Sequence, residues 1–80
     1  MAEIRDLSIG TRANYVYQDG KKQIGTIVGR KFGDIIEGDI DISHLNSHKT
    51  ENFIKIKFDN LGVPPETISI SGNPNNIELL

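Results

Sequence analysis

Isoleucine dominates the apolar residues of this chain, which contains thirteen isoleucines against five leucines, three valines and two alanines. A side chain branched at Cβ restricts χ1 in a helix and fits the pleated surface of a sheet. Eight glycines, three prolines and seven asparagines interrupt the chain at short intervals, as in a protein with many turns. We therefore predict an all-β fold.

Alternation of apolar and polar residues predicts five strands, over 12–18, 22–29, 34–42, 52–58 and 67–71. Asp19-Gly20 separates the first two ranges and predicts a tight hairpin with a type I′ turn. Residues 30–33 are expected to form a short basic loop, and Pro64-Pro65 indicates a loop over 59–66. Residues 3–9 fit either one short helical turn or an extended lead-in.

A chain of 80 residues is expected to form a single domain, 1–80, because independent cores rarely form in fewer than about 50 residues. The apolar runs are far too short to span a bilayer, and the absence of cysteine excludes disulfides and thiolate metal sites. We expect a cytoplasmic protein without membrane contact.

Gly25 and Gly29 share a strand face with Ile27, a position where glycine usually marks bending or the close approach of another backbone. A small, strongly bent, partly open barrel is therefore predicted.

Three groups of residues have a distinctive spacing: Leu7-Ser8-Ile9-Gly10, then Gly20, Gly25 and Ile27, then Ile70-Ser71-Gly72 with Ile77. The first two groups resemble the first motif of the Sm-like (LSm) proteins, which is a short helix ending in an apolar-x-Gly turn, followed by hairpin glycines and an aliphatic residue. The third group partly matches that family's second motif. The resemblance implies a five-stranded Sm-like barrel, and an SH3-like or OB-like barrel is the alternative.

The residues that the resemblance implies for an RNA pocket are largely replaced. Lys31 and Ile35 stand where the family has aspartate and asparagine. Ser71 replaces the arginine of the second motif, and Gln23 occupies an aromatic position. The resemblance therefore implies a ring-shaped homo-oligomer but argues against RNA binding at the usual pocket.

Charge is unevenly distributed along the chain, although the net charge is only −2. Residues 1–33 carry six basic and three acidic side chains, whereas residues 34–51 carry one basic and five acidic side chains. The candidate nucleic-acid or anion-binding residues are Lys21, Lys22, Arg30, Lys31, Phe32 and Asn73. The basic residues would contact phosphates and the phenylalanine would stack on a base. Alternatively, the lysines keep a hairpin tip soluble and the asparagine fixes a turn.

Glu37, Asp39 and Asp41 form an acidic stripe at alternate positions of one predicted strand. Such residues lie about 7 Å apart, too far to share a proton. The stripe is a candidate protein-binding surface, and the alternative is a solvated face that resists edge-to-edge aggregation. His44 and His48 lack a third ligand at a recognised spacing, so we expect no metal and no cofactor.

The sequence contains neither a nucleophile elbow nor a glycine-rich phosphate loop, and we predict that the protein is not an enzyme. The preferred hypothesis is a binding or assembly module that recognises another protein, as adaptor or inhibitor, through the acidic strand face or a sheet edge. The second is a homo-oligomeric Sm-like protein that binds single-stranded RNA or another nucleic acid through loops 30–34 and 72–76. A third is capture of a small anion between subunits by Arg30 and Lys31.

Overall fold

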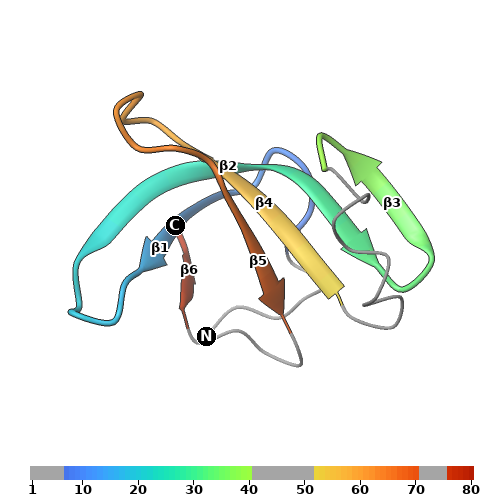
Figure 1. Cartoon of the computed structure of the whole chain (residues 1–80), viewed down its shortest axis with the longest axis horizontal. Helices are drawn as coiled ribbons and strands as arrows, with labels where there is room; N and C mark the ends of the chain where they lie inside the picture. Colours follow the sequence, from blue (N-terminus) through green and yellow to red (C-terminus); the bar gives the residue numbers. More distant parts are fainter. Residues whose placement is uncertain (1–6, 41–51, 71–75) are drawn as a thin grey trace.

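The computed structural model describes residues 7–40, 52–70 and 76–80, and these residues form one antiparallel sheet without a helix (Figure 1). The strands are β1 (Arg12–Val16), β2 (Lys22–Phe32), β3 (Ile35–Gly38), β4 (Asn52–Phe58), β5 (Glu66–Ile70) and β6 (Ile77–Leu79). Their order is β5-β4-β2-β1-β6, and β3 pairs with the second half of β2. The predicted all-β fold is confirmed, with six strands in place of five. The sheet is not closed, so β5 and β6 lie at its two ends.

One face of the sheet carries the hydrophobic core. The buried cluster consists of Leu7, Ala13, Ile27, Ile54, Ile56, Phe58, Ile68 and Ile77. The range predicted for β4 is confirmed, because isoleucine and phenylalanine alternate with lysine along this strand and only the apolar residues reach the core. The sequence left the buried face of β1 open. The structure assigns it to Ala13, which is fully buried, and to Tyr15, which packs against the cluster.

The second strand is longer than predicted, and the basic loop expected over 30–33 is wrong. β2 continues through Phe32, and only residues 33 and 34 form the turn to β3. This end of β2 has a partner on each side, since Lys31 pairs with Phe53 of β4 and Phe32 pairs with Ile35 of β3. Pairing along both edges keeps the basic segment extended.

The hairpin between β1 and β2 is confirmed, but its turn is not the predicted type I′. The amide of Tyr17 donates to the carbonyl of Lys21 at 2.8 Å, and the amide of Gly20 donates to the carbonyl of Tyr17 at 3.0 Å. Gly20 has a φ of 87°, whereas none of the described non-glycine residues has a positive φ. A type I′ turn needs two positive φ angles, so the loop instead has three residues with glycine in the left-handed position.

The remaining predicted elements differ from the structure mainly at their ends. β5 (Glu66–Ile70) begins one residue earlier than the predicted strand 67–71, whose last residue lies outside the described part, and Ile68 is buried as expected. Of the strand expected over 34–42, β3 covers only Ile35–Gly38, and residues 41 and 42 lie outside the described part. β6 is an additional strand, which pairs with β1 and places Ile77 in the core. The helical turn or extended lead-in expected over 3–9 falls mostly on residues that the structure does not describe. Of the described ones, 7 and 8 are not helical, and 9 and 10 form a turn in which the amide of Thr11 donates to the carbonyl of Ser8 at 3.1 Å.

Two glycines in β2 allow the strong bend of this strand that Figure 1 shows. A Cβ on Gly25 would lie 2.6 Å from the carbonyl oxygen of Lys57, and one on Gly29 would collide with the backbone of Asp39. Between these glycines the register with β4 shifts, as at a β-bulge, which sharpens the local bend. The close backbone approach predicted from the sequence is confirmed at both positions.

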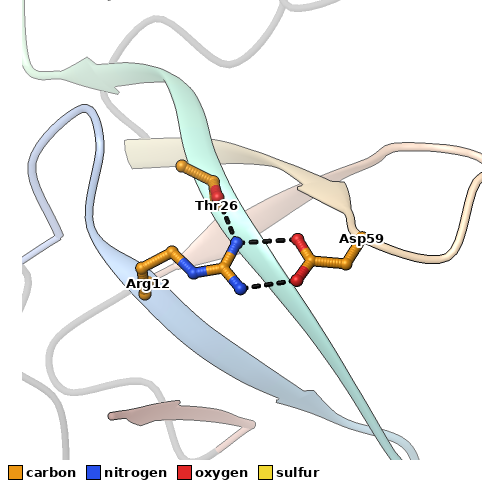
Figure 2. Close-up of polar contacts among 3 residues, drawn as sticks. All are labelled: Arg12, Thr26 and Asp59. Atoms are coloured by element: carbon orange, nitrogen blue, oxygen red, sulfur yellow. Dashed lines mark hydrogen bonds and ion pairs between the residues drawn. The ribbon is translucent and has the colours of Figure 1, made fainter.

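Arg12 links three strands on the surface of the sheet (Figure 2). Its Nη1 donates to Thr26 Oγ1 at 2.8 Å and to Asp59 Oδ1 at 2.7 Å, and its Nη2 donates to Asp59 Oδ2 at 2.5 Å. The guanidinium therefore forms a fork with the carboxylate and connects the start of β1, the middle of β2 and the residue after β4. Hydrogen bonding from Arg12 holds the pKa of Asp59 below its ordinary value of 3.8.

Asp59→Asn is expected to destabilise the protein at neutral pH and to make little difference in acid. Because the Asp59 pKa is lowered in the folded state, its contribution is present above the unfolded-state pKa of about 4 and disappears as pH falls through the lower folded-state pKa. Urea unfolding from neutral pH to about pH 3 measures the gap between wild type and variant. The matched control is Asp34→Asn at the exposed turn before β3. A gap for Asp59→Asn that stays constant with pH would contradict the role of the fork.

Candidate functional site

An open groove lies where the sheet fails to close. Its volume is about 810 Å³, and its lining residues are Tyr15, Val16, Tyr17, Gln18, Asp19, Glu66 and Asn76. These residues come from β1, from the hairpin loop that follows it, from the first position of β5 and from the residue before β6. Both end strands of the sheet thus border the groove or adjoin it, and β1 forms its floor.

Two tyrosines form the aromatic part of the groove. The rings of Tyr15 and Tyr17 meet edge to face, with centroids 4.8 Å apart and planes at 88°. The Tyr15 ring also lies 6.2 Å from that of Phe58, measured between centroids, and Phe58 belongs to the core. The core therefore fixes Tyr15, the inner tyrosine, and contact with Tyr15 positions Tyr17, the outer tyrosine. Both phenol rings are half-buried.

Two carboxylates give the groove a negative charge. Partial burial raises the pKa of the Tyr17 phenol above 10.0, and the nearby charge of Glu66 raises it further, with smaller contributions from Tyr15 and Asp19. Among the described residues Glu66 forms no ion pair. The Nζ of Lys21 lies 4.0 Å from Asp19 Oδ2, but this lysine side chain is 84 % exposed, so the pair is strongly screened. None of the described residues that line the groove is basic.

The acidic stripe contacts cations of the same chain. Glu37 Oε1 lies 3.7 Å from Nε of Arg30, and Asp39 Oδ2 accepts a hydrogen bond from Nζ of Lys55 at 3.2 Å. Asp41 lies outside the described residues. Both described carboxylates therefore have an intramolecular partner, although both remain exposed enough for a second contact.

The basic candidates do not form one surface. Lys21 and Lys22 lie at the β1–β2 hairpin, whereas Arg30, Lys31 and Phe32 lie at the opposite end of the bent β2 strand (Figure 1). Lys22 forms an ion pair with Glu78 at 2.8 Å. The last of the candidates, Asn73, falls outside the described part of the chain.

The three neighbouring candidates at the end of β2 are engaged or covered. Arg30 donates to the carbonyl of Leu7 at 3.4 Å and lies 5.5 Å from the centre of the Phe32 ring. Lys31 is only 8 % exposed. A loop that would present these side chains together to a phosphate backbone is therefore not formed.

The groove was not predicted from the sequence, although part of its signal was visible. Alternation places Tyr15 and Tyr17 on one face, but nothing local connects this face to Glu66, which follows the β4–β5 loop. The fold itself brings the two segments together. Within the described residues no cluster of three or more histidine, aspartate or glutamate side chains could hold a metal ion. The same part of the chain contains no helix with the length and apolarity to cross a membrane.

Comparison with models of known protein families, with curated proteins and with solved structures finds no match.

Proposed function

We propose that the protein is a non-enzymatic recognition module that binds an extended segment of another protein in the groove at the opening of the sheet. The observation that supports this most directly is that the groove is bordered by the first residue of β5 and by the residue before β6, the two edge strands of the sheet. β5 pairs only with β4 and β6 only with β1 among the described elements. An extended segment that lies beside an edge strand gains main-chain hydrogen bonds, and a neighbouring pocket gives side-chain selectivity.

We also infer that the sheet is an open form of a small SH3-like or Sm-like barrel. In favour of this, β6 returns from the end of the chain to lie beside β1, and the glycines of β2 permit the bend that a barrel needs. In such a barrel the last two strands would come together. The groove occupies the opening between them.

The groove supports protein recognition better than the acidic strand face does. Glu37 and Asp39 each already contact a cation of the chain, Arg30 and Lys55 respectively, whereas Glu66 has no ion-pair partner among the described residues. Nucleic-acid binding is the weaker hypothesis, because its basic residues are divided between the two ends of β2. The Sm-like alternative is tested by absolute mass in solution, since a closed ring with bound RNA would favour it.

The proposal is tested by selecting binders from a display library of random linear peptides and measuring their affinities by calorimetry. Tyr17→Ala removes the outer ring of the groove and should weaken the selected peptides about tenfold. Phe32→Ala is the matched control, because it removes an exposed ring at the far end of β2. Glu37→Gln probes the acidic strand face.

Affinity lost in Tyr17→Ala and kept in the other two variants supports the groove. If peptide affinity is lost only in Glu37→Gln, the binding site is the acidic strand face and not the groove. Failure to select any peptide sensitive to Tyr17→Ala would overturn the proposal. Amide NMR spectra of each variant confirm that the fold is retained.

A further inference from the structure

We propose that the groove receives an arginine side chain of its partner, an inference that rests on the function proposed above. The two tyrosine rings and the carboxylates of Asp19 and Glu66 would together hold the guanidinium.

The aromatic part of the groove suits a cation. A positive group is attracted to the face of a tyrosine ring, and the attraction grows where water is partly excluded. Tyr15 and Tyr17 both line the groove, and their ring planes are nearly perpendicular, so the two ring faces are turned in different directions. Contact with the core residue Phe58 holds this arrangement before a ligand arrives. A preformed site loses less conformational entropy on binding.

The charges of the groove also select a cation. Asp19 and Glu66 are the charged residues that line it, and the other polar lining residues, Gln18 and Asn76, are neutral. Asp19 Oδ1 accepts a hydrogen bond from the backbone amide of Lys21 at 3.0 Å and its Oδ2 lies 4.0 Å from Nζ of the same lysine, but the aspartate side chain is still 58 % exposed and free to make a further contact. An acidic or apolar side chain would remove water from these carboxylates without replacing its hydrogen bonds, and a neutral donor would leave their charge without a counter-charge.

Arginine fits better than lysine because a guanidinium is planar, stacks on aromatic rings and donates to both oxygens of a carboxylate. The protein contains both kinds of contact within its own fold. Arg12 forms a two-bond fork with Asp59, and Arg30 lies over the ring of Phe32. The groove offers the same two partners, a carboxylate and a ring, and none of the described residues that line it is an arginine.

The direct test is titration of the isotopically labelled full chain with N-acetyl-arginine amide, followed by amide NMR. N-acetyl-citrulline amide is the matched control, since a neutral urea replaces the guanidinium in the same shape. We expect saturable shifts at Tyr17 and Glu66 with arginine and at least about fivefold weaker binding of citrulline. Equal affinity for the two compounds, or equal affinity for N-acetyl-lysine amide, would overturn the inference.

A pair of double variants shows whether arginine binding depends on the carboxylates of the groove or only on the net charge of the protein. Asp19→Asn/Glu66→Gln should weaken arginine binding about fivefold. Asp39→Asn/Glu37→Gln changes the net charge equally on the β3 side and should leave binding unchanged. Equal losses in both would contradict the groove assignment.

The selected peptides separate the two proposals. Replacing arginine by citrulline in a peptide sensitive to Tyr17→Ala should weaken it about tenfold. If such peptides bind in the groove but contain no arginine or tolerate citrulline, this inference fails and the proposed function stands. If no selected peptide is sensitive to Tyr17→Ala, the proposed function itself fails.

Discussion

Replacing Ile56 with alanine is expected to lower the free energy of unfolding by about 2–5 kcal/mol, which is a large part of the total for a domain of this size. The side chain is fully buried in the middle of β4 and stands opposite Ile27 of β2, which is also fully buried. Alanine would leave a cavity at the centre of the core. Neighbouring strands are fixed by hydrogen bonds on both sides and can relax only partly.

Ile35→Ala is the matched control for this prediction. It removes the same atoms from a side chain that is 58 % exposed on β3, and we expect a loss below about 0.5 kcal/mol. Urea unfolding followed by circular dichroism measures both variants. Similar losses for the two substitutions would show that the core does not depend on the β2–β4 contact described here.

The second large effect is expected from Gly25→Ala, which should cost about 2–4 kcal/mol. The added Cβ would lie 2.6 Å from the carbonyl oxygen of Lys57 and 2.9 Å from Cγ1 of Ile56. The first contact is with backbone, so β2 and β4 would have to move apart. The bend of β2 would then change along with the hydrogen bonds between the two strands.

Gly62→Ala provides the control for the glycine substitution. A Cβ there would approach only the side-chain oxygen of Asn60, at 3.3 Å, in the exposed loop between β4 and β5. We expect a change within about 0.5 kcal/mol, measured by the same unfolding experiment. A small effect of Gly25→Ala would mean that the strand tolerates the displacement, and it would argue against close approach as the reason for this glycine.

Much of the sheet could be predicted because the alternation of apolar and polar residues within a single segment identifies a strand. β4 alternates apolar and lysine residues, and the period alone identifies both its range and its buried face. The end of β2 could not be predicted in this way, since Arg30, Lys31 and Phe32 are typical of a loop in isolation. They are extended because β3 and β4 pair with both edges of the strand. The length of a strand therefore depends here on partners that local pattern does not reveal.

The candidate site was harder to predict than the fold for the same reason. The acidic stripe and the basic residues were visible as clusters in sequence, but the sheet pairs Arg30 with Glu37 across adjacent strands. The two sets therefore neutralise each other in part. The groove combines Tyr17 with Glu66, and only the open arrangement of the sheet brings these distant segments to one place.

β2 is the strand on which the cooperativity of the whole molecule depends. It pairs directly with β1, β3 and β4, while β5 and β6 are attached to the sheet through β4 and β1. Once β2 has left the sheet, β1 and β4 each lose one partner, β3 loses the strand it pairs with, and two separate pairs remain, β4–β5 and β1–β6. Partial unfolding can begin at either end strand, β5 or β6, but after release of β2 the remaining strands no longer form one sheet. The two end strands, which border the groove or adjoin it, can therefore open locally while the pairing of β2 with β1 and β4 persists.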